Sequence, residues 1–251
     1  MTSSRSGRRV PKRPPLVLLL LAAVGLGLFV VPLIGLLART PWADLAALLS
    51  GDVAVEALRL SMLTSLAATA IAALVGVPLA WVLARVDFPG RALVRGIVLL
   101  PLVLPPVVGG AALLFALGRR GVIGEPIYEA TGFVLPFSTW GVVLAAAFVA
   151  TPFLVITVEA ALRTLDGRFE GAAATLGAGR WTVLRRVTLP MIGPSLISGL
   201  VLTWARALGE FGATVTFAGN LPGRTQTLPL AVFVALESDR DTAIALSLVM
   251  V

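Results

Sequence analysis

The sequence predicts an all-helical protein that crosses a membrane several times. Of its 251 residues, 58% are hydrophobic and 13% are charged, whereas about a quarter of the residues of soluble domains are charged. Apolar runs long enough to cross ~30 Å of hydrocarbon as helices recur along the chain, with polar breaks between them. Together these observations indicate a polytopic membrane protein.

Five apolar runs reach the length of about 20 residues that a spanning helix needs. They cover residues 16–38, 60–83, 96–117, 140–161 and 191–211. The first is too long for a signal peptide and lacks a small-residue cleavage site, so we interpret it as an anchor. A sixth run starts at Asp241, whose carboxylate suits a helix N-terminus. Only residues 242–251 follow, so we expect six spans in all and a natural chain that continues past Val251.

The third run contains three prolines within six residues, Pro101, Pro105 and Pro106, followed by Gly109 and Gly110. A single proline in a membrane helix is readily explained as a packing kink. Three so close together predict a bend in this span with a role beyond packing.

The positive residues predict the orientation. Thirteen of the twenty Lys and Arg residues fall on the side of the N-terminus and five on the other, while Arg59 and Arg206 fall at or inside helix ends. The larger group is Arg5, Arg8, Arg9, Lys12, Arg13, Arg85, Arg91, Arg95, Arg163, Arg168, Arg180, Arg185 and Arg186; the smaller is Arg39, Arg119, Arg120, Arg224 and Arg240. Because cytoplasmic segments carry the excess of positive residues, we expect the N-terminus in the cytoplasm, with the chain multi-pass in the plasma membrane.

Several chemistries are excluded by composition. The chain has no Cys and no His, which removes disulfides, thiol chemistry and the usual zinc sites, and we expect neither a metal nor a cofactor. Its only lysine is Lys12, so it has no GxxxxGK[ST] phosphate loop. A membrane enzyme would have only carboxylates, Ser and Thr to work with. The net charge of +7 is scattered between apolar runs, which favours membrane orientation over nucleic-acid binding.

The stretch EGAAATLGAGRWTVLRRVTLP, residues 170–190, combines small and basic residues in a cytoplasmic loop. Small side chains allow another surface to approach the backbone closely. Trp181, Val183, Leu184 and Val187 give the second half an apolar side. From periodicity alone, the loop could rest on lipid headgroups or dock on a protein.

The segment AAATLG is followed after nine residues by VTLP, and this arrangement resembles the EAA loop of ABC-importer permeases. In that family the loop forms a coupling helix that sits in a groove of the ATPase subunit. The resemblance implies a type I ABC importer permease fold and a transport subunit that uses the ATP hydrolysis of a partner. It also implies an ATPase interface made by Glu170, Gly171, Ala172, Ala173, Leu176, Gly177 and Arg180. One position departs: Gly171 stands where the family usually carries glutamate, and Glu170 precedes it.

Two further stretches, LLPLVLPPVVGG (99–110) and ARALGEFGATVTFAGNLPGRTQTLPL (205–230), resemble the permeases of molybdate importers. Sulfate permeases share the LGEFG core, so sulfate or tungstate remains the alternative substrate. The resemblance implies an extracytoplasmic oxyanion-binding protein and a second permease copy, most simply an identical one. It divides the chain into a basic tail (1–15), an anchor with an external loop (16–53) and a permease core (54–251) whose coupling loop is 163–190.

Within the predicted spans we count one charged pair, Arg206 and Glu210, one helical turn apart. Lone charges in the bilayer are costly, so these residues should pair or face a cavity. Since the LGEFG motif covers residues 208–212, we expect Arg206, Glu210, Phe211 and Thr214 at the pathway or its outer gate. The alternative is a snorkelling arginine beside a solvated glutamate. A self-powered secondary transporter would need more ionisable residues at membrane depth and clear inverted repeats.

Overall fold

A computed structural model describes residues 15–251, so the basic tail predicted for residues 1–15 lies, except for Pro15, outside the described residues. Every regular element in this range is helical, which confirms the predicted fold class. The elements are α1 (Leu16–Arg39), α2 (Leu45–Ser50), α3 (Asp52–Arg85), α4 (Arg91–Val103), α5 (Pro106–Leu117), α6 (Gly124–Thr131), α7 (Thr139–Thr164), α8 (Arg168–Thr175), α9 (Arg180–Val183), the π-helical turn η1 (Leu184–Thr188), α10 (Leu189–Met191), α11 (Gly193–Leu208), α12 (Gly212–Phe217), α13 (Leu228–Ser238) and α14 (Arg240–Val249).

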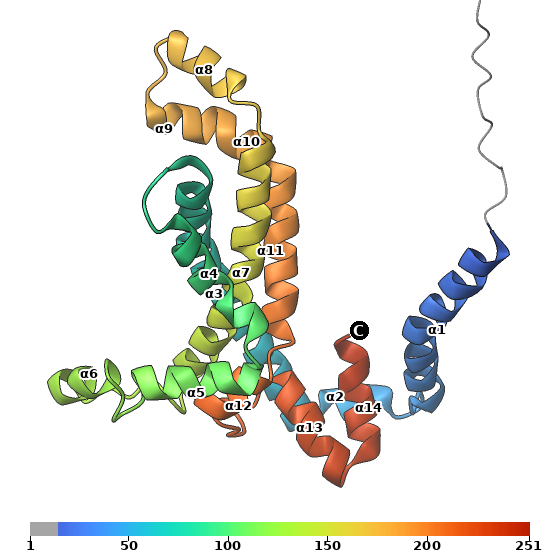
Figure 1. Cartoon of the computed structure of the whole chain (residues 1–251). Helices are drawn as coiled ribbons and strands as arrows, with labels where there is room; N and C mark the ends of the chain where they lie inside the picture. The colour runs from blue at the N-terminus through green and yellow to red at the C-terminus, as the bar shows by residue number, and fades with distance from the viewer. Residues whose placement is uncertain (1–14) are drawn as a thin grey trace, which may run out of the picture.

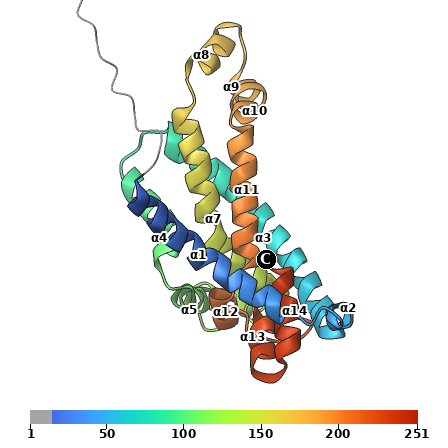
Figure 2. The same cartoon turned by 90° about the vertical axis from the view of Figure 1, so that its right-hand side faces the viewer.

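The core is a bundle of α3, α7 and α11, which pack on one another along their lengths (Figures 1 and 2). Small residues allow this close packing: a Cβ at Gly76 of α3 would lie 3.3 Å from Thr151 of α7, and one at Gly199 of α11 would lie 3.1 Å from Leu154 of α7. Membrane helices pack through small residues in this way, because lipid offers apolar side chains the same environment as the protein. We call the end where α3 and α7 stop and α11 begins the loop end, and the opposite end the far end.

Within the described residues, the five full spans predicted fall on three single helices, on the bent pair of α4 and α5, and on α11, which forms a second bent pair with the loop segment Arg180–Met191. The single helices long and apolar enough to cross a membrane are α1, α3 and α7. The predicted start of the second span, residue 60, is late, because α3 already begins at Asp52. Both bent pairs coincide with Pro or Gly near the break.

The third predicted span, 96–117, is wrong as a single helix. It consists of α4 and α5, which meet at an angle of 119°. Leu104 and Pro105 between them adopt extended backbone, with ψ of 135° and 134°. The residue before a proline avoids helical backbone and prolines lack the N–H that continues a helix, so the consecutive Pro105 and Pro106 stop α4 and start α5. The bend expected from the prolines is thus confirmed, and α5 runs across the far end of the bundle (Figure 1).

The fifth and sixth runs also differ from prediction. The fifth ends at Leu208 instead of residue 211, and the short helix α12 follows after a break at residues 209–211. The helix of the sixth run is capped by Asp239, not Asp241: Asp239 Oδ1 accepts from the backbone N–H groups of Asp241 and Thr242, each at 3.2 Å. Hydrogen bonds from the Thr242 side chain and backbone lower the pKa of Asp239. A further apolar helix, α13, precedes this cap and had not been predicted.

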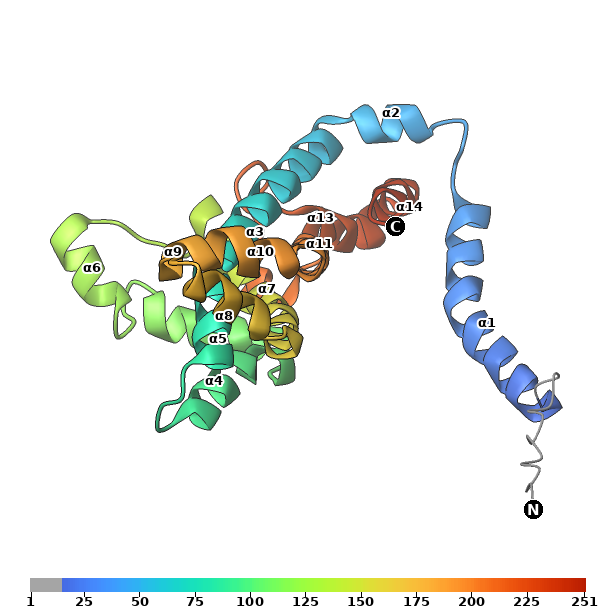
Figure 3. The same cartoon turned by 90° about the horizontal axis from the view of Figure 1, so that it is seen from above.

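Helix α1 lies apart from the bundle, to which α2 connects it (Figure 3). None of its residues is buried, and its main contact within the described residues is with α14. An apolar helix exposed on all sides fits a hydrocarbon environment, which agrees with the anchor predicted for this run.

Candidate functional site

The loop between α7 and α11 extends beyond the ends of both helices (Figure 1). Its first helix, α8, ends in a Schellman cap, in which Gly177 N–H donates to Ala174 O and Ala178 N–H to Ala173 O, both at 3.0 Å. The cap needs Gly177 at φ +83°, a left-handed backbone that residues with a Cβ rarely adopt. The glycine of the predicted loop motif therefore sets the turn that folds α9 back beside α8.

Most residues predicted to form the coupling surface are exposed: Gly171, Ala172, Leu176, Gly177 and Arg180. Leu176 is 89% exposed, and the apolar side chains of Phe169 and Trp181 are 53% and 73% exposed. Ala173 is only half-buried within the loop. Large apolar side chains at the tip of a projecting loop are typical of a surface that binds another protein or a membrane.

Glu170 differs from its neighbours because its carboxylate faces the chain itself. Oε2 lies 3.1 Å from Arg85 Nη2 in the last turn of α3, and Oε1 accepts a hydrogen bond from Thr188 Oγ1 at 2.6 Å. Beside this contact lies a cavity of about 650 Å³. Its walls are Trp81 and Arg85 of α3 and the inner faces of α8, α9 and η1.

At the far end, Arg206 and Glu210 form an ion pair with Nη2 and Oε2 2.6 Å apart. The expectation that these charges pair is confirmed. Glu210 is 2% exposed and lies after the last residue of α11. Its Oε1 accepts from Ala213 N–H of α12 at 2.8 Å. Glu210 is therefore not the wet glutamate of the snorkelling alternative; it joins the two helices across the break.

The other two residues predicted for the pathway lie beside this pair. Phe211 contacts Phe233 of α13, with ring centroids 5.2 Å apart. Thr214 of α12 is 1% exposed, and its Oγ1 has no hydrogen-bond partner among the described residues. A buried hydroxyl without a partner retains the ability to bind water or a ligand.

The α5 and α12 segments approach within backbone contact at this end. A Cβ at Gly212 of α12 would lie 2.7 Å from Pro106 Cβ, and a Cβ at Gly110 of α5 would lie 2.7 Å from Ala213 O. The proline-rich bend of α4 and α5 thus packs directly on the helix that Glu210 caps. The predicted pathway residues and the predicted bend therefore form one cluster.

One buried charge was missed by sequence reasoning. Glu159 lies within the predicted span 140–161, is 2% exposed, and pairs with Arg95 of α4 at 3.0 Å and with Arg163 at 2.8 Å. The count of a single charged pair in the spans was therefore wrong. A signal existed, because Glu159 and Arg163 have the i, i+4 spacing, with glutamate first, that favours a pair on a helix.

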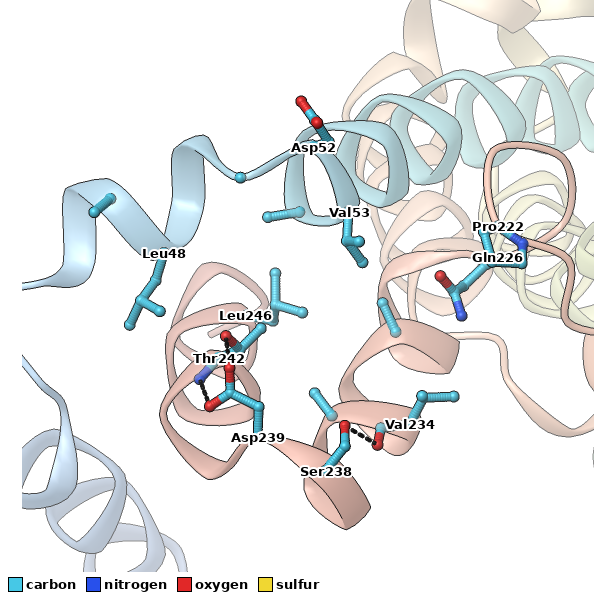
Figure 4. A pocket seen from close by; sticks show the side chains of 15 residues that line it. Leu48, Asp52, Val53, Pro222, Gln226, Val234, Ser238, Asp239, Thr242 and Leu246 are labelled. Atoms are coloured by element: carbon cyan, nitrogen blue, oxygen red, sulfur yellow. Dashed lines mark hydrogen bonds between the residues drawn. The ribbon is translucent and has the colours of Figure 1, made fainter.

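A second cavity, of about 660 Å³, lies at the far end between α2, the start of α3 and the α13–α14 hairpin (Figure 4). The charged residues among the described ones that line it are Asp52 and Asp239. Two carboxylates would repel a dianion. This cavity is therefore a poor candidate for an anion pathway.

Comparison with known proteins gives consistent matches. Residues 76–251 match the family described as binding-protein-dependent transport system inner membrane component. The chain is 49% identical over 232 residues to the molybdenum transport system permease protein ModB of Mycobacterium tuberculosis (strain H37Rv), covering 92% of this chain and 87% of that protein. It is 47% identical over 182 residues to ModB of Escherichia coli (strain K12), covering 71% and 80%. A probable sulfate transport system permease protein of Chlorokybus atmophyticus is 35% identical over 213 residues, covering 84% and 74%.

Among solved structures, the fold is similar to a bacterial ABC transporter involved in the import of the acidic polysaccharide alginate. The TM-score is 0.70 at 19% identity, and the match covers 93% of this chain and 88% of that one. At this identity the match shows the fold alone.

Proposed function

We propose that this chain, which belongs to the family of binding-protein-dependent transport system inner membrane components, forms the membrane pathway for molybdate. Members of this family are transport subunits of ABC importers. The observation that carries the substrate is the identity of 47% and 49% with two permeases named for molybdenum transport, against 35% with one named for sulfate. Both substrates are tetrahedral dianions, so the pathway chemistry alone separates them poorly.

The energy for transport comes from a partner ABC ATPase that docks on the loop between α7 and α11. The exposed Leu176 and Trp181 support this assignment, because both side chains would become buried in a protein groove. Gly171 and Ala172 beside them leave the backbone of α8 open to close approach. The loop end of the bundle is then cytoplasmic, as is the N-terminus.

An external binding protein delivers the anion to the far end. A solved structure similar to this chain is of an alginate ABC transporter in complex with a periplasmic protein bound to alginate pentasaccharide, which supports such a partner here. From the resemblance to molybdate permeases we assign the permease core to residues 54–251, of which residues 76–251 match the family, and we pair it with a second copy. Closure of the ATPases on ATP pushes the two loops together and turns the cavity between the copies from inward-open to outward-open, and the binding protein then releases its anion into it.

Arg206 is the residue that attracts the anion at this outer gate, with Glu210, Phe211 and Thr214 around it. Glu210 offsets the charge of the guanidinium at 2.6 Å, so the anion is attracted without being held too tightly to leave. The unpartnered hydroxyl of Thr214 supports a role in contacting the anion or its water.

Uptake of labelled molybdate tests the proposal. A strain that lacks its own molybdate importer is complemented with the complete operon, including ATPase and binding protein, and uptake is measured with and without excess sulfate or tungstate. We expect uptake that excess sulfate leaves unchanged. Uptake abolished by sulfate, together with transport of labelled sulfate, would assign the chain to sulfate instead; no uptake of any oxyanion would refute the proposal.

A further inference from the structure

A cavity separates the loop between α7 and α11 from α3. The 650 Å³ space has Trp81 of α3 on one side and Ala174, Ala178 and Trp181 of the loop on the other. The ion pair of Arg85 with Glu170 crosses from one wall to the other. The helices of the loop otherwise pack mainly on one another and on η1 and α11 among the described residues. This pair is therefore the direct polar link between loop and α3.

Glu170 also holds the two arms of the loop together. Its second oxygen accepts from Thr188, which is 1% exposed and ends the π-helical turn η1 on the returning arm. Single π-helical turns frequently occur at functional sites, because one extra residue per turn changes the direction of the side chains that follow. The carboxylate of this α8 residue thus contacts η1 through Thr188 and α3 through Arg85.

The Arg85–Glu170 pair is partly protected from solvent. Its side chains are 25% and 24% exposed, whereas the neighbouring ion pair of Arg91 with Asp87 has a carboxylate that is 98% exposed. Water and salt screen an exposed pair more strongly than a partly buried one. Of these two pairs, the one with Glu170 is therefore less screened by water and salt.

From α3 the contacts continue to α7 and α4. Arg163 Nη2 of α7 donates to Leu83 O in the last turns of α3 at 3.4 Å, and the buried Glu159 binds both Arg163 and Arg95 of α4. The chain of α4 continues through the bend into α5, which packs on α12 at the far end. These contacts connect the end of α3 with the segments around Glu210.

We infer that Glu170 is a positioning residue that transmits movement of the loop to α3 through Arg85, and does not itself bind the ATPase. The inference rests on the proposed function, since it assumes that an ATPase moves this loop. It accounts for the shift by one residue noted in the sequence: Gly171 leaves the outer face of α8 small, while Glu170 points inward.

The test uses the complete transporter with its ATPase and binding protein in proteoliposomes. For the variants Glu170→Gln and Arg85→Gln, three quantities are measured: co-purification of the ATPase, ATP hydrolysis and molybdate uptake. We expect normal co-purification and hydrolysis, with the ratio of uptake to hydrolysis reduced about tenfold, within the usual range of coupling between sites. The exchanged pair Arg85→Glu with Glu170→Arg restores opposite charges at the two positions and should recover much of the ratio.

Asp87→Asn is the matched control, because it removes an ion pair at the same end of α3 that is open to solvent; its ratio should equal that of the parent. An unchanged ratio in Glu170→Gln overturns the inference. Loss of ATPase co-purification in Glu170→Gln would overturn it as well, since Glu170 would then be an ATPase contact. Failure of the proposed function is distinguishable, because the parent transporter would then show no uptake at all.

Discussion

Arg206 Nη2 and Glu210 Oε2 lie 2.6 Å apart and connect the last turn of α11 to the break before α12. The two side chains differ in environment, with the arginine 26% and the glutamate 1% exposed. The glutamate therefore depends on its partner for charge compensation, while part of the arginine side chain stays exposed at the surface of the chain. This asymmetry determines what substitutions should do.

Arg206→Ala should lower both stability and uptake more than the double variant Arg206→Ala with Glu210→Ala. Removing one partner of a buried pair leaves an uncompensated charge, at a cost of about 3–5 kcal/mol. Glu210→Gln should be milder, because its amide oxygen can still accept from Ala213 N–H. The measurements are the thermal unfolding midpoint in detergent and the initial molybdate uptake rate at equal membrane level. Losses that simply add in the double variant would show that the two residues act independently.

Leu176→Glu should prevent association with the ATPase. Leu176 is 89% exposed in the isolated chain, so the substitution should not disturb folding, but burial of an unpaired charge in the complex costs several kcal/mol. We expect ATPase affinity to fall by more than about tenfold in a co-purification assay. Leu221→Glu is the control, because Leu221 is an exposed leucine at the far end. Equal ATPase binding by both variants would exclude the tip of α8 from the interface.

Gly177→Ala should weaken coupling without affecting the bundle. The left-handed backbone at φ +83° costs a residue with a Cβ about 1–2 kcal/mol, so the Schellman cap should loosen. Limited proteolysis of the loop should become faster, and ATPase affinity should decrease. Gly179→Ala is the control, since Gly179 has φ −67° and open space around the added methyl. If the two variants behave alike, the left-handed turn is not required.

Gly212→Ala should destabilise the far end. The added methyl would lie 2.7 Å from Pro106 Cβ, and overpacking of this kind costs about 1–3 kcal/mol. The thermal unfolding midpoint should decrease. Gly96→Ala, inside α4 with nothing within 4 Å of the new Cβ, should leave the midpoint unchanged or raise it, because Ala favours helix. An unchanged midpoint in Gly212→Ala would contradict the close approach of α5 and α12.

The orientation can be tested with single cysteines, because the chain has none of its own. The exposed positions Thr131 and Glu237 lie at the far end, and Gly179 lies in the loop. An impermeant thiol reagent should label Thr131→Cys and Glu237→Cys on intact cells, and Gly179→Cys only after lysis. Labelling of Gly179→Cys from outside would reverse the topology and remove the ATPase role of the loop.

Prediction of the elements succeeded where a local property decides the outcome. Apolar length located α1, α3 and α7, and Pro105 and Pro106 located the break between α4 and α5. Prediction failed where two features compete within one run. The extent of the fifth span was overestimated because Gly209 and Phe211 are compatible with a membrane helix, so the sequence does not show that the helix ends before them. The contact of Glu210 with Ala213 N–H, which joins α11 to α12 across the break, is visible only in the fold.

The sequence alone determined that this chain lies in a membrane, is helical, carries a loop with small residues and a turn glycine, and resembles ABC-importer permeases. These properties follow from composition, run length and local backbone preference, which depend on neighbouring residues only. The tertiary structure decided the partners of the charges, which are Arg85 for Glu170 and Arg95 for Glu159. It also decided the packing of Pro106 on Gly212. Such contacts join residues far apart in the chain, and a low dielectric makes each charge depend on a partner that periodicity does not identify.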